Sequence, residues 1–152
     1  MLLKKFGLEN ANPVTTPLDP NVNLDNDEME DGSNNQSEEV SHGYATLIGS
    51  LMYLALGTQP DIAYAVNKLV QFTQLPKPKH WTAVKQVFCY LKGTQNLSLT
   101  YGRAKELLSQ EINIFCDADW AGGADRESTS SYVVTIAGGA IAWSSKKQAS
   151  IA

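Results

Sequence analysis

The chain has 152 residues, a length that suits one domain or one and a half. Of these residues 43% are hydrophobic and 18% are charged, which is typical of a soluble globular protein. It contains no run of about 18 apolar residues and no basic leader followed by an apolar stretch, so we expect neither a membrane span nor a secretory signal. The net charge of −4 divides unevenly, because residues 1–67 carry two basic and ten acidic residues, or −8, whereas residues 68–152 carry ten basic and six acidic residues, or +4. The acidic half would repel nucleic acid, and the charge of the basic half is high enough only for weak binding of phosphate groups.

The first forty residues are predicted to be mostly irregular. Residues 1–20 begin with an apolar cluster and continue with Pro13, Pro17 and Pro20, which favour an extended path. Residues 21–41 are acidic and polar, so they cannot bury enough surface to offset the entropy lost on ordering. We therefore predict a tail over 1–20 and a disordered linker over 21–41.

Residues 42–95 are predicted to form a small unit of three helices. Apolar residues recur at the spacing of one helical face over 42–57, from about Thr58 to Val70, and from about Lys79 to Leu91. The expected buried residues are Tyr44, Leu47, Ile48, Leu51, Met52 and Ala55 in the first helix, Ile62, Ala65, Val66, Leu69 and Val70 in the second, and Trp81, Val84, Val87, Phe88 and Leu91 in the third.

His80 lies at the start of the third predicted helix. A catalytic or metal-binding histidine needs a nucleophile or further ligands nearby, and no Cys or Asp stands at ligand spacing from this one. The other histidine, His42, lies beside the predicted linker. We therefore expect His80 to pack or to start the helix rather than to carry chemistry.

The last third of the chain has apolar residues at every second position, which is typical of strands. We predict a short strand over 97–101, a central strand over 112–118, and two more over 129–137 and 140–144, with Gly138–Gly139 as a hairpin turn. The last three strands would form an antiparallel meander that needs a second layer over its buried face. The predicted fold class is therefore α+β.

Asp117 and Asp119 stand at the end of the strand predicted over 112–118, on the same face because strand side chains alternate. Adjacent carboxylates repel unless a cation or hydrogen-bond donors neutralise them. Mg²⁺ takes such oxygen ligands in phosphoryl-transfer enzymes. Acids that end a strand and meet water are more common, and spacing alone favours that interpretation.

Motifs along the chain resemble those of copia-type retrotransposon Pol polyproteins, in the order found in that family. The stretches that resemble its connection region are 44–54, Gln59-Pro-Asp-Ile-Ala-Tyr-Ala-Val66 and Tyr90-Leu-Lys-Gly-Thr94. Those that resemble the start of its ribonuclease H domain are Cys116-Asp-Ala-Asp-Trp-Ala-Gly122 and Ala142-Trp-Ser-Ser-Lys-Lys-Gln148. Lys5-Phe-Gly-Leu8 and Pro13-Val-Thr-Thr-Pro17 resemble the end of its reverse transcriptase.

The resemblance implies four regions. They are the tail of a reverse transcriptase over 1–20, the acidic linker over 21–41, the helical connection region over 42–95, and the N-terminal part of a ribonuclease H-like domain over 96–152. The implied partners are an RNA–DNA hybrid and the remainder of the Pol polyprotein.

The resemblance also implies a site. The family's ribonuclease H cleaves the RNA strand of an RNA–DNA hybrid with two Mg²⁺ ions, which an aspartate on the first strand helps to hold. Asp117 matches that position, so the resemblance implies that it is a catalytic, metal-binding residue. The resemblance implies that Asp119 belongs to the same motif as a polar neighbour of the site, and that it is not a usual metal ligand.

The chain departs from the family pattern where further ligands would follow. After the Ser-Lys-Lys-Gln run the family continues into a helix with a second carboxylate, and residues 1–152 contain neither that helix nor the polymerase aspartates. We therefore expect an incomplete site at Asp117, weak or absent Mg²⁺ binding, and no nuclease activity from this chain alone. Gln59 and Ser131 replace an Arg and a Gly that are usual in the family, which affects contacts and not the fold.

A non-catalytic module that binds a nucleic-acid duplex or another protein is the alternative. The lysines that would make such contacts are Lys77, Lys79, Lys85, Lys92, Lys146 and Lys147. A solvated face is the simpler interpretation, and we favour it. We expect an intracellular location, in the cytoplasm or the nucleus, because Cys89 and Cys116 resemble reduced core thiols.

Overall fold

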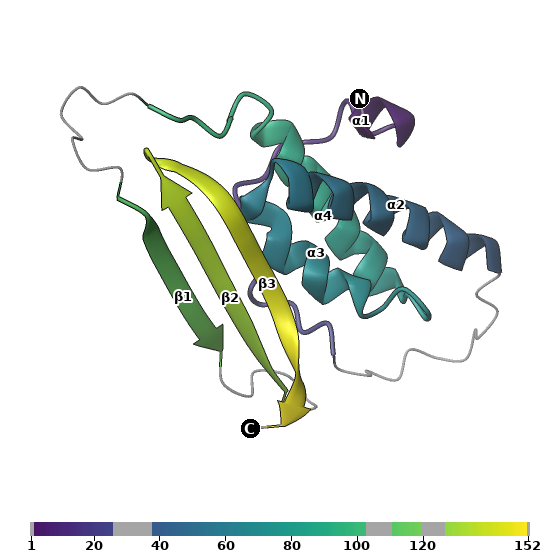
Figure 1. Ribbon diagram of the computed structural model, residues 1–152. Coiled ribbons are helices and arrows are strands. Elements are labelled where there is room, and N and C mark those ends of the chain that lie inside the picture. Colours follow the sequence, from purple (N-terminus) through teal and green to yellow (C-terminus); the bar gives the residue numbers. More distant parts are fainter. Residues whose placement is uncertain (1, 26–37, 103–110, 120–126, 152) are drawn as a thin grey trace.

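The computed structural model describes residues 2–25, 38–102, 111–119 and 127–151. It confirms the α+β class, with helices beside a three-stranded antiparallel sheet (Figure 1). The elements are the helices α1 (Leu2–Lys5), α2 (Glu38–Gly57), η1 (Pro60–Ile62, a 3₁₀ turn), α3 (Ala63–Val70) and α4 (Pro78–Gly93), and the strands β1 (Asn113–Asp119), β2 (Glu127–Ile136) and β3 (Gly139–Ile151). In this part of the chain no helix has the length and apolar character needed to cross a membrane.

The hydrophobic core lies between α2, α3 and α4, where the predicted helical faces meet. Of the predicted residues, all are buried or half-buried except Met52, which is 40% exposed. Tyr44 is fully buried, and its hydroxyl donates a 2.9 Å hydrogen bond to the carbonyl oxygen of Leu69, so α2 is joined to α3 by a polar contact within the core. This burial raises the pKa of Tyr44.

His80 packs at the start of α4, as expected. Its Nδ1 accepts the backbone N–H of Lys77 at 2.9 Å, which satisfies a donor at the helix start, and its Nε2 lies 3.2 Å from the carbonyl oxygen of Leu24. The ring stacks on Phe72 with centroids 3.9 Å apart. Because desolvation disfavours the imidazolium, burial lowers the pKa of His80.

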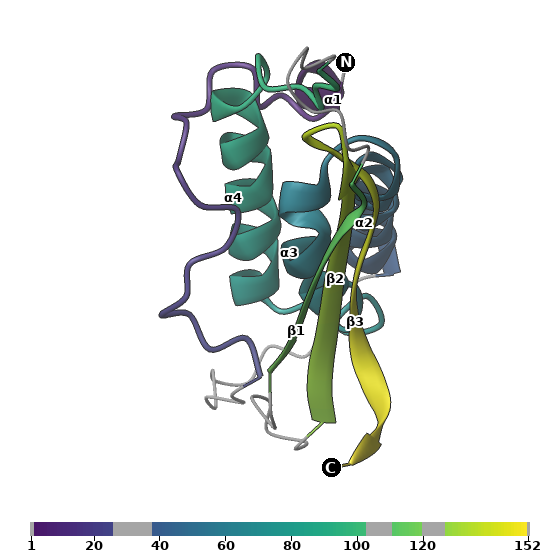
Figure 2. The ribbon, with the colours of Figure 1, turned by 60° about the vertical axis from the view of Figure 1, so that its left-hand side comes forward.

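Residues 2–25 form a strap that runs along α4 (Figure 2). Leu24 is buried, and Asp25 forms a 2.7 Å ion pair with Lys68. The disordered linker predicted over 21–41 is therefore wrong at both ends, because 21–25 pack on the helices and α2 begins at Glu38. Its remainder, 26–37, lies outside the described residues. Within 21–25, Leu24 is buried although its neighbours are polar, and average composition does not reveal such a residue.

The sheet has the order β1-β2-β3, with both pairs antiparallel, which confirms the predicted meander. The middle strand is β2, so the central position predicted for 112–118 is wrong. The hairpin turns at Ala137 and Gly138, both at positive φ, one residue before the predicted turn. β3 extends to Ile151, well beyond the predicted 144, because its polar end still pairs with β2.

The strand predicted over 97–101 is absent, and this segment crosses the β2–β3 hairpin instead. The hydroxyl of Tyr101 donates a 2.6 Å hydrogen bond to the carbonyl oxygen of Ala140. The backbone N–H of Gly102 donates a 3.1 Å hydrogen bond to the carbonyl oxygen of Ala137. A Cβ built on Gly139 would lie 2.5 Å from the Tyr101 ring. The alternation of Leu97, Leu99 and Tyr101 therefore forms no strand here, and Leu97 and Tyr101 stay exposed.

Candidate functional site at the end of strand β1

Asp117 lies on β1 in a row of residues that crosses the sheet. It is opposite Ser131 of β2, which is opposite Ser145 of β3, and residues paired in this way project from the same face. The Ser131 hydroxyl is 3.0 Å from that of Ser145, and the two form a hydrogen bond. The carboxylate is therefore followed across the sheet by two hydroxyl groups.

The face that carries this row is turned toward the helices. Trp143, two residues before Ser145, shares that face, and its indole N–H donates a 2.6 Å hydrogen bond to the carbonyl oxygen of Ala55 in α2. β3 lies nearest the helices and β1 farthest from them (Figure 1). Asp117 consequently stays exposed, although it projects from the covered side of the sheet.

The surroundings of Asp117 supply little that would hold a metal. Its Oδ1 accepts the backbone N–H of Ala118 at 2.9 Å. Over the described ranges, which omit 120–126, no three His, Cys, Asp or Glu side chains gather as a metal-binding group. Asp119 belongs to β1, but its side chain lies outside the described atoms. The residues in view therefore do not fit a two-metal centre, and we derive no catalytic step through one.

The structure does not gather the candidate nucleic-acid-binding lysines on one surface. Lys146 and Lys147 are consecutive in β3, so they project from opposite faces of the sheet. Lys147 forms a 3.3 Å ion pair with Glu127. In α4, Lys79 and Lys92 donate to the strap carbonyls of Asn23 and Glu9, respectively.

Two of the family-like motifs contact each other within the helical unit. The Tyr90 hydroxyl donates a 2.7 Å hydrogen bond to the carboxylate of Asp61, which follows the proline at the start of η1. Burial and the bond to this carboxylate raise the pKa of Tyr90 to about 12. These two motif residues therefore join η1 to α4, a structural role that the sequence analysis did not predict.

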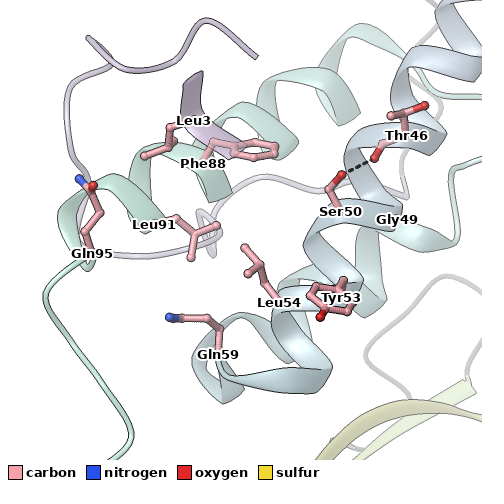
Figure 3. A pocket seen from close by; sticks show the side chains of 10 residues that line it. All are labelled: Leu3, Thr46, Gly49, Ser50, Tyr53, Leu54, Gln59, Phe88, Leu91 and Gln95. Atoms are coloured by element: carbon pink, nitrogen blue, oxygen red, sulfur yellow. Dashed lines mark hydrogen bonds between the residues drawn. The ribbon is translucent and has the colours of Figure 1, made fainter. Parts of the chain in front are cut away.

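The structure also contains an open cavity of about 790 Å³ between α1, α2 and α4 (Figure 3). Its lining is Leu3, Thr46, Gly49, Ser50, Tyr53, Leu54, Gln59, Phe88, Leu91 and Gln95. The sequence analysis missed it because most of these residues lie outside the predicted buried faces. It has no acidic or basic side chain and no residue from the sheet, so it does not extend the Asp117 site.

The two cysteines differ in environment. Both are free thiols, Cys89 half-buried in α4 and Cys116 exposed on β1. The expectation of a core thiol is therefore wrong for Cys116, because β1 has no covering layer over that residue in the part of the chain that the structure describes.

Comparison with known proteins decides the family. The chain is 37% identical over 152 residues to the retrovirus-related Pol polyprotein from transposon TNT 1-94 of Nicotiana tabacum, covering 99% of this chain and 11% of that protein. It is 38% identical over 148 residues to the one from transposon RE1 of Arabidopsis thaliana, covering 97% of this chain and 9% of that protein. The chain belongs to the copia-type Pol polyprotein family. It spans about a tenth of the length of these Pol relatives.

A shorter relative shares part of the same Pol-like region. The chain is 43% identical over 110 residues to the secreted RxLR effector protein 161 of Plasmopara viticola, covering 72% of this chain and 75% of that protein. No family model and no solved structure matches the chain.

Proposed function

We propose that residues 96–152 form the first part of a ribonuclease H-like domain of a Pol polyprotein, and that residues 42–95 form the connection region that precedes it. Asp117 would be one of the carboxylates that hold Mg²⁺ for cleavage of the RNA strand in an RNA–DNA hybrid. One observation carries the proposal: Asp117 is exposed on the first strand of an antiparallel meander, in a chain of the copia-type Pol family.

The same geometry leads us to propose that the 152 residues do not cleave RNA by themselves. Two-metal hydrolysis needs several carboxylates to fix two ions about 4 Å apart and to offset their charge. A single exposed carboxylate leaves Mg²⁺ largely hydrated and weakly held. The remaining ligands would come from other parts of a longer Pol product, and Asp117 would act only together with them.

Paramagnetic broadening of backbone amide signals by Mn²⁺ tests this proposal on the purified chain. Mn²⁺ takes the same oxygen ligands as Mg²⁺, so the Ala118 and Ser131 amides should broaden at millimolar Mn²⁺. Asp117→Asn should remove this broadening, whereas Glu9→Gln, the same loss of charge at an exposed carboxylate far along the chain, should leave it. Broadening that is unchanged by Asp117→Asn would contradict a metal-binding role for this residue. Stoichiometric micromolar binding would contradict the incompleteness of the site.

A further inference from the structure

The open cavity between α1, α2 and α4 combines apolar side chains with uncharged polar ones (Figure 3). Leu54, Phe88 and Leu91 supply apolar surface, and Ser50 and Gln59 supply a hydroxyl and an amide. Its volume of about 790 Å³ falls within the range of about 300–1,000 Å³ that is typical of binding pockets. A charged group would lose its hydration there without gaining an opposite charge. The cavity therefore suits an uncharged, mostly apolar occupant.

The apolar surface continues beyond the cavity along α2. Tyr53 lines the cavity and is 81% exposed, and Leu56 is 73% exposed. These two side chains are neighbours, because residues three apart lie on the same face of a helix. Both are left without cover in the part of the chain that the structure describes. An apolar surface that extends past a pocket in this way is typical of contact with another polypeptide rather than with a small molecule.

The N-terminal strap already packs against one wall of the cavity. Leu3 lines the cavity and is only 7% exposed. The ring of Phe6 lies on that of Phe88, with centroids 5.5 Å apart. Ten further residues before Leu3 would reach about 30 Å when extended, so any part of the cavity is within their range.

We propose that the polypeptide that precedes residue 1 in a Pol product packs apolar side chains into this cavity and over Tyr53 and Leu56. The Pol relatives from transposons TNT 1-94 and RE1 are about ten times as long as this chain, so most of such a product lies outside the 152 residues. Direct attachment gives a neighbouring segment an effective concentration in the millimolar range, which favours it over a separate molecule. The proposal rests on the place of the chain in a longer Pol product and is independent of the role of Asp117.

The reaction rate of a thiol introduced at position 50 tests the proposal, because thiol reactions depend on access. Ser50→Cys is placed in a chain that carries Cys89→Ser and Cys116→Ser, and Ser98→Cys, at an exposed position outside the cavity, is the matched control. The 152-residue chain should react rapidly at both positions. The chain is then extended by the 20 residues that precede the matching segment of the TNT 1-94 polyprotein, enough for a helix of about 30 Å. The extension should slow the reaction at position 50 at least tenfold and leave that at position 98 unchanged.

A charge in the cavity should reverse this protection. Gly49 lines the cavity, and a Cβ built on it would meet nothing within 4 Å, so Gly49→Glu has room in the 152-residue chain. Beneath a packed segment the added carboxylate would be buried without a partner. Gly49→Glu should therefore restore rapid reaction at position 50 of the extended chain. Gly57→Glu, at another open glycine of α2 that does not line the cavity, should not. The ratio of rates with and without the extension is compared, so any effect of the new charge on the thiol itself cancels.

The same 20 residues supplied as a separate peptide at 1 mM should also slow the reaction at position 50, which keeps the test independent of how the extended chain folds. An unchanged rate at position 50 in both forms would overturn the proposal, as would protection that survives Gly49→Glu. Slow reaction of the 152-residue chain by itself would overturn it too. A rate that falls with protein concentration would identify a second copy as the occupant, and a rate independent of concentration would identify another part of this chain. In any of these outcomes the proposed role of Asp117 would still stand.

Discussion

The indole N–H of Trp143 donates a hydrogen bond to the carbonyl oxygen of Ala55, 88 residues earlier in the chain. Ala55 lies in the last turn of α2, where main-chain carbonyls have no partner within the helix. This bond is one of the contacts that join the sheet to the helical unit, and it lies on the face of the sheet that also carries Asp117.

Trp143→Phe should therefore weaken the attachment of the sheet. The change keeps an aromatic ring but removes the donor, so we expect the free energy of unfolding to fall by about 1 kcal/mol. Urea unfolding followed by circular dichroism measures the change. Tyr132→Phe, on the open face, is the control and should change the free energy of unfolding by less than about 0.5 kcal/mol. Equal effects for the two variants would contradict a specific role for the Trp143–Ala55 bond.

Gly139→Ala should destabilise the chain through contact with the segment that crosses the hairpin. The added Cβ would lie 2.5 Å from the Tyr101 ring and 2.8 Å from the carbonyl oxygen of Thr100, and the backbone there cannot move cheaply. We expect a loss of about 1–3 kcal/mol in the free energy of unfolding, as for other overpacked sites. Gly102→Ala meets nothing within 4 Å and should be nearly neutral. A neutral Gly139→Ala would show that residues 97–102 do not pack on the hairpin.

The stability of the chain should fall as the pH falls below about 6.5, because of His80. Burial lowers the pKa of folded His80, so below its ordinary value near 6.5 the unfolded chain binds the proton more readily. Protonation of Nδ1 would also remove the acceptor for the Lys77 N–H. Lys77 and Lys79 nearby lower the pKa further, while the Leu24 carbonyl and Asp25 oppose this shift.

His80→Gln isolates that effect. Gln at the third helical position can still accept the N–H at the helix start, but it does not titrate. The free energy of unfolding measured at pH 7.5 and at pH 5.0 should differ less in His80→Gln than in the wild type. All other residues are the same in the two proteins, so their contribution cancels in this comparison. An equal pH dependence in the two proteins would show that His80 is not the cause.

The sequence predicted those parts of the fold in which periodicity corresponds to burial. The helical faces around Leu51, Leu69 and Phe88 are buried, and the meander has its predicted order along the chain. The predictions that failed concern segments whose local sequence pattern does not match the contacts that they make in the fold. Residues 97–101 alternate without a strand partner, and Leu24 is buried although its surroundings are polar.

The candidate site was less predictable than the fold. Spacing alone favoured a solvent-facing role for Asp117, and the structure shows an exposed carboxylate, which fits that interpretation as well as a catalytic one. Only the family resemblance distinguishes the two. The bond between Tyr90 and Asp61 could not be foreseen, because it depends on how η1 is packed against α4.

Cleavage of the RNA strand by a chimeric Pol, in which this chain replaces the matching segment of the TNT 1-94 polyprotein, tests the role of Asp117 most directly. Loss of a group that only hydrogen-bonds to a metal ligand lowers activity by about 10–100-fold. Loss of a ligand itself should cost more, so Asp117→Asn should lower the rate of cleavage in Mg²⁺ by at least about 100-fold. DNA synthesis by the same polypeptide should be unchanged, and Asp119→Asn should retain cleavage. Cleavage at the unsubstituted rate by a chimera carrying Asp117→Asn, with DNA synthesis intact, would contradict the account.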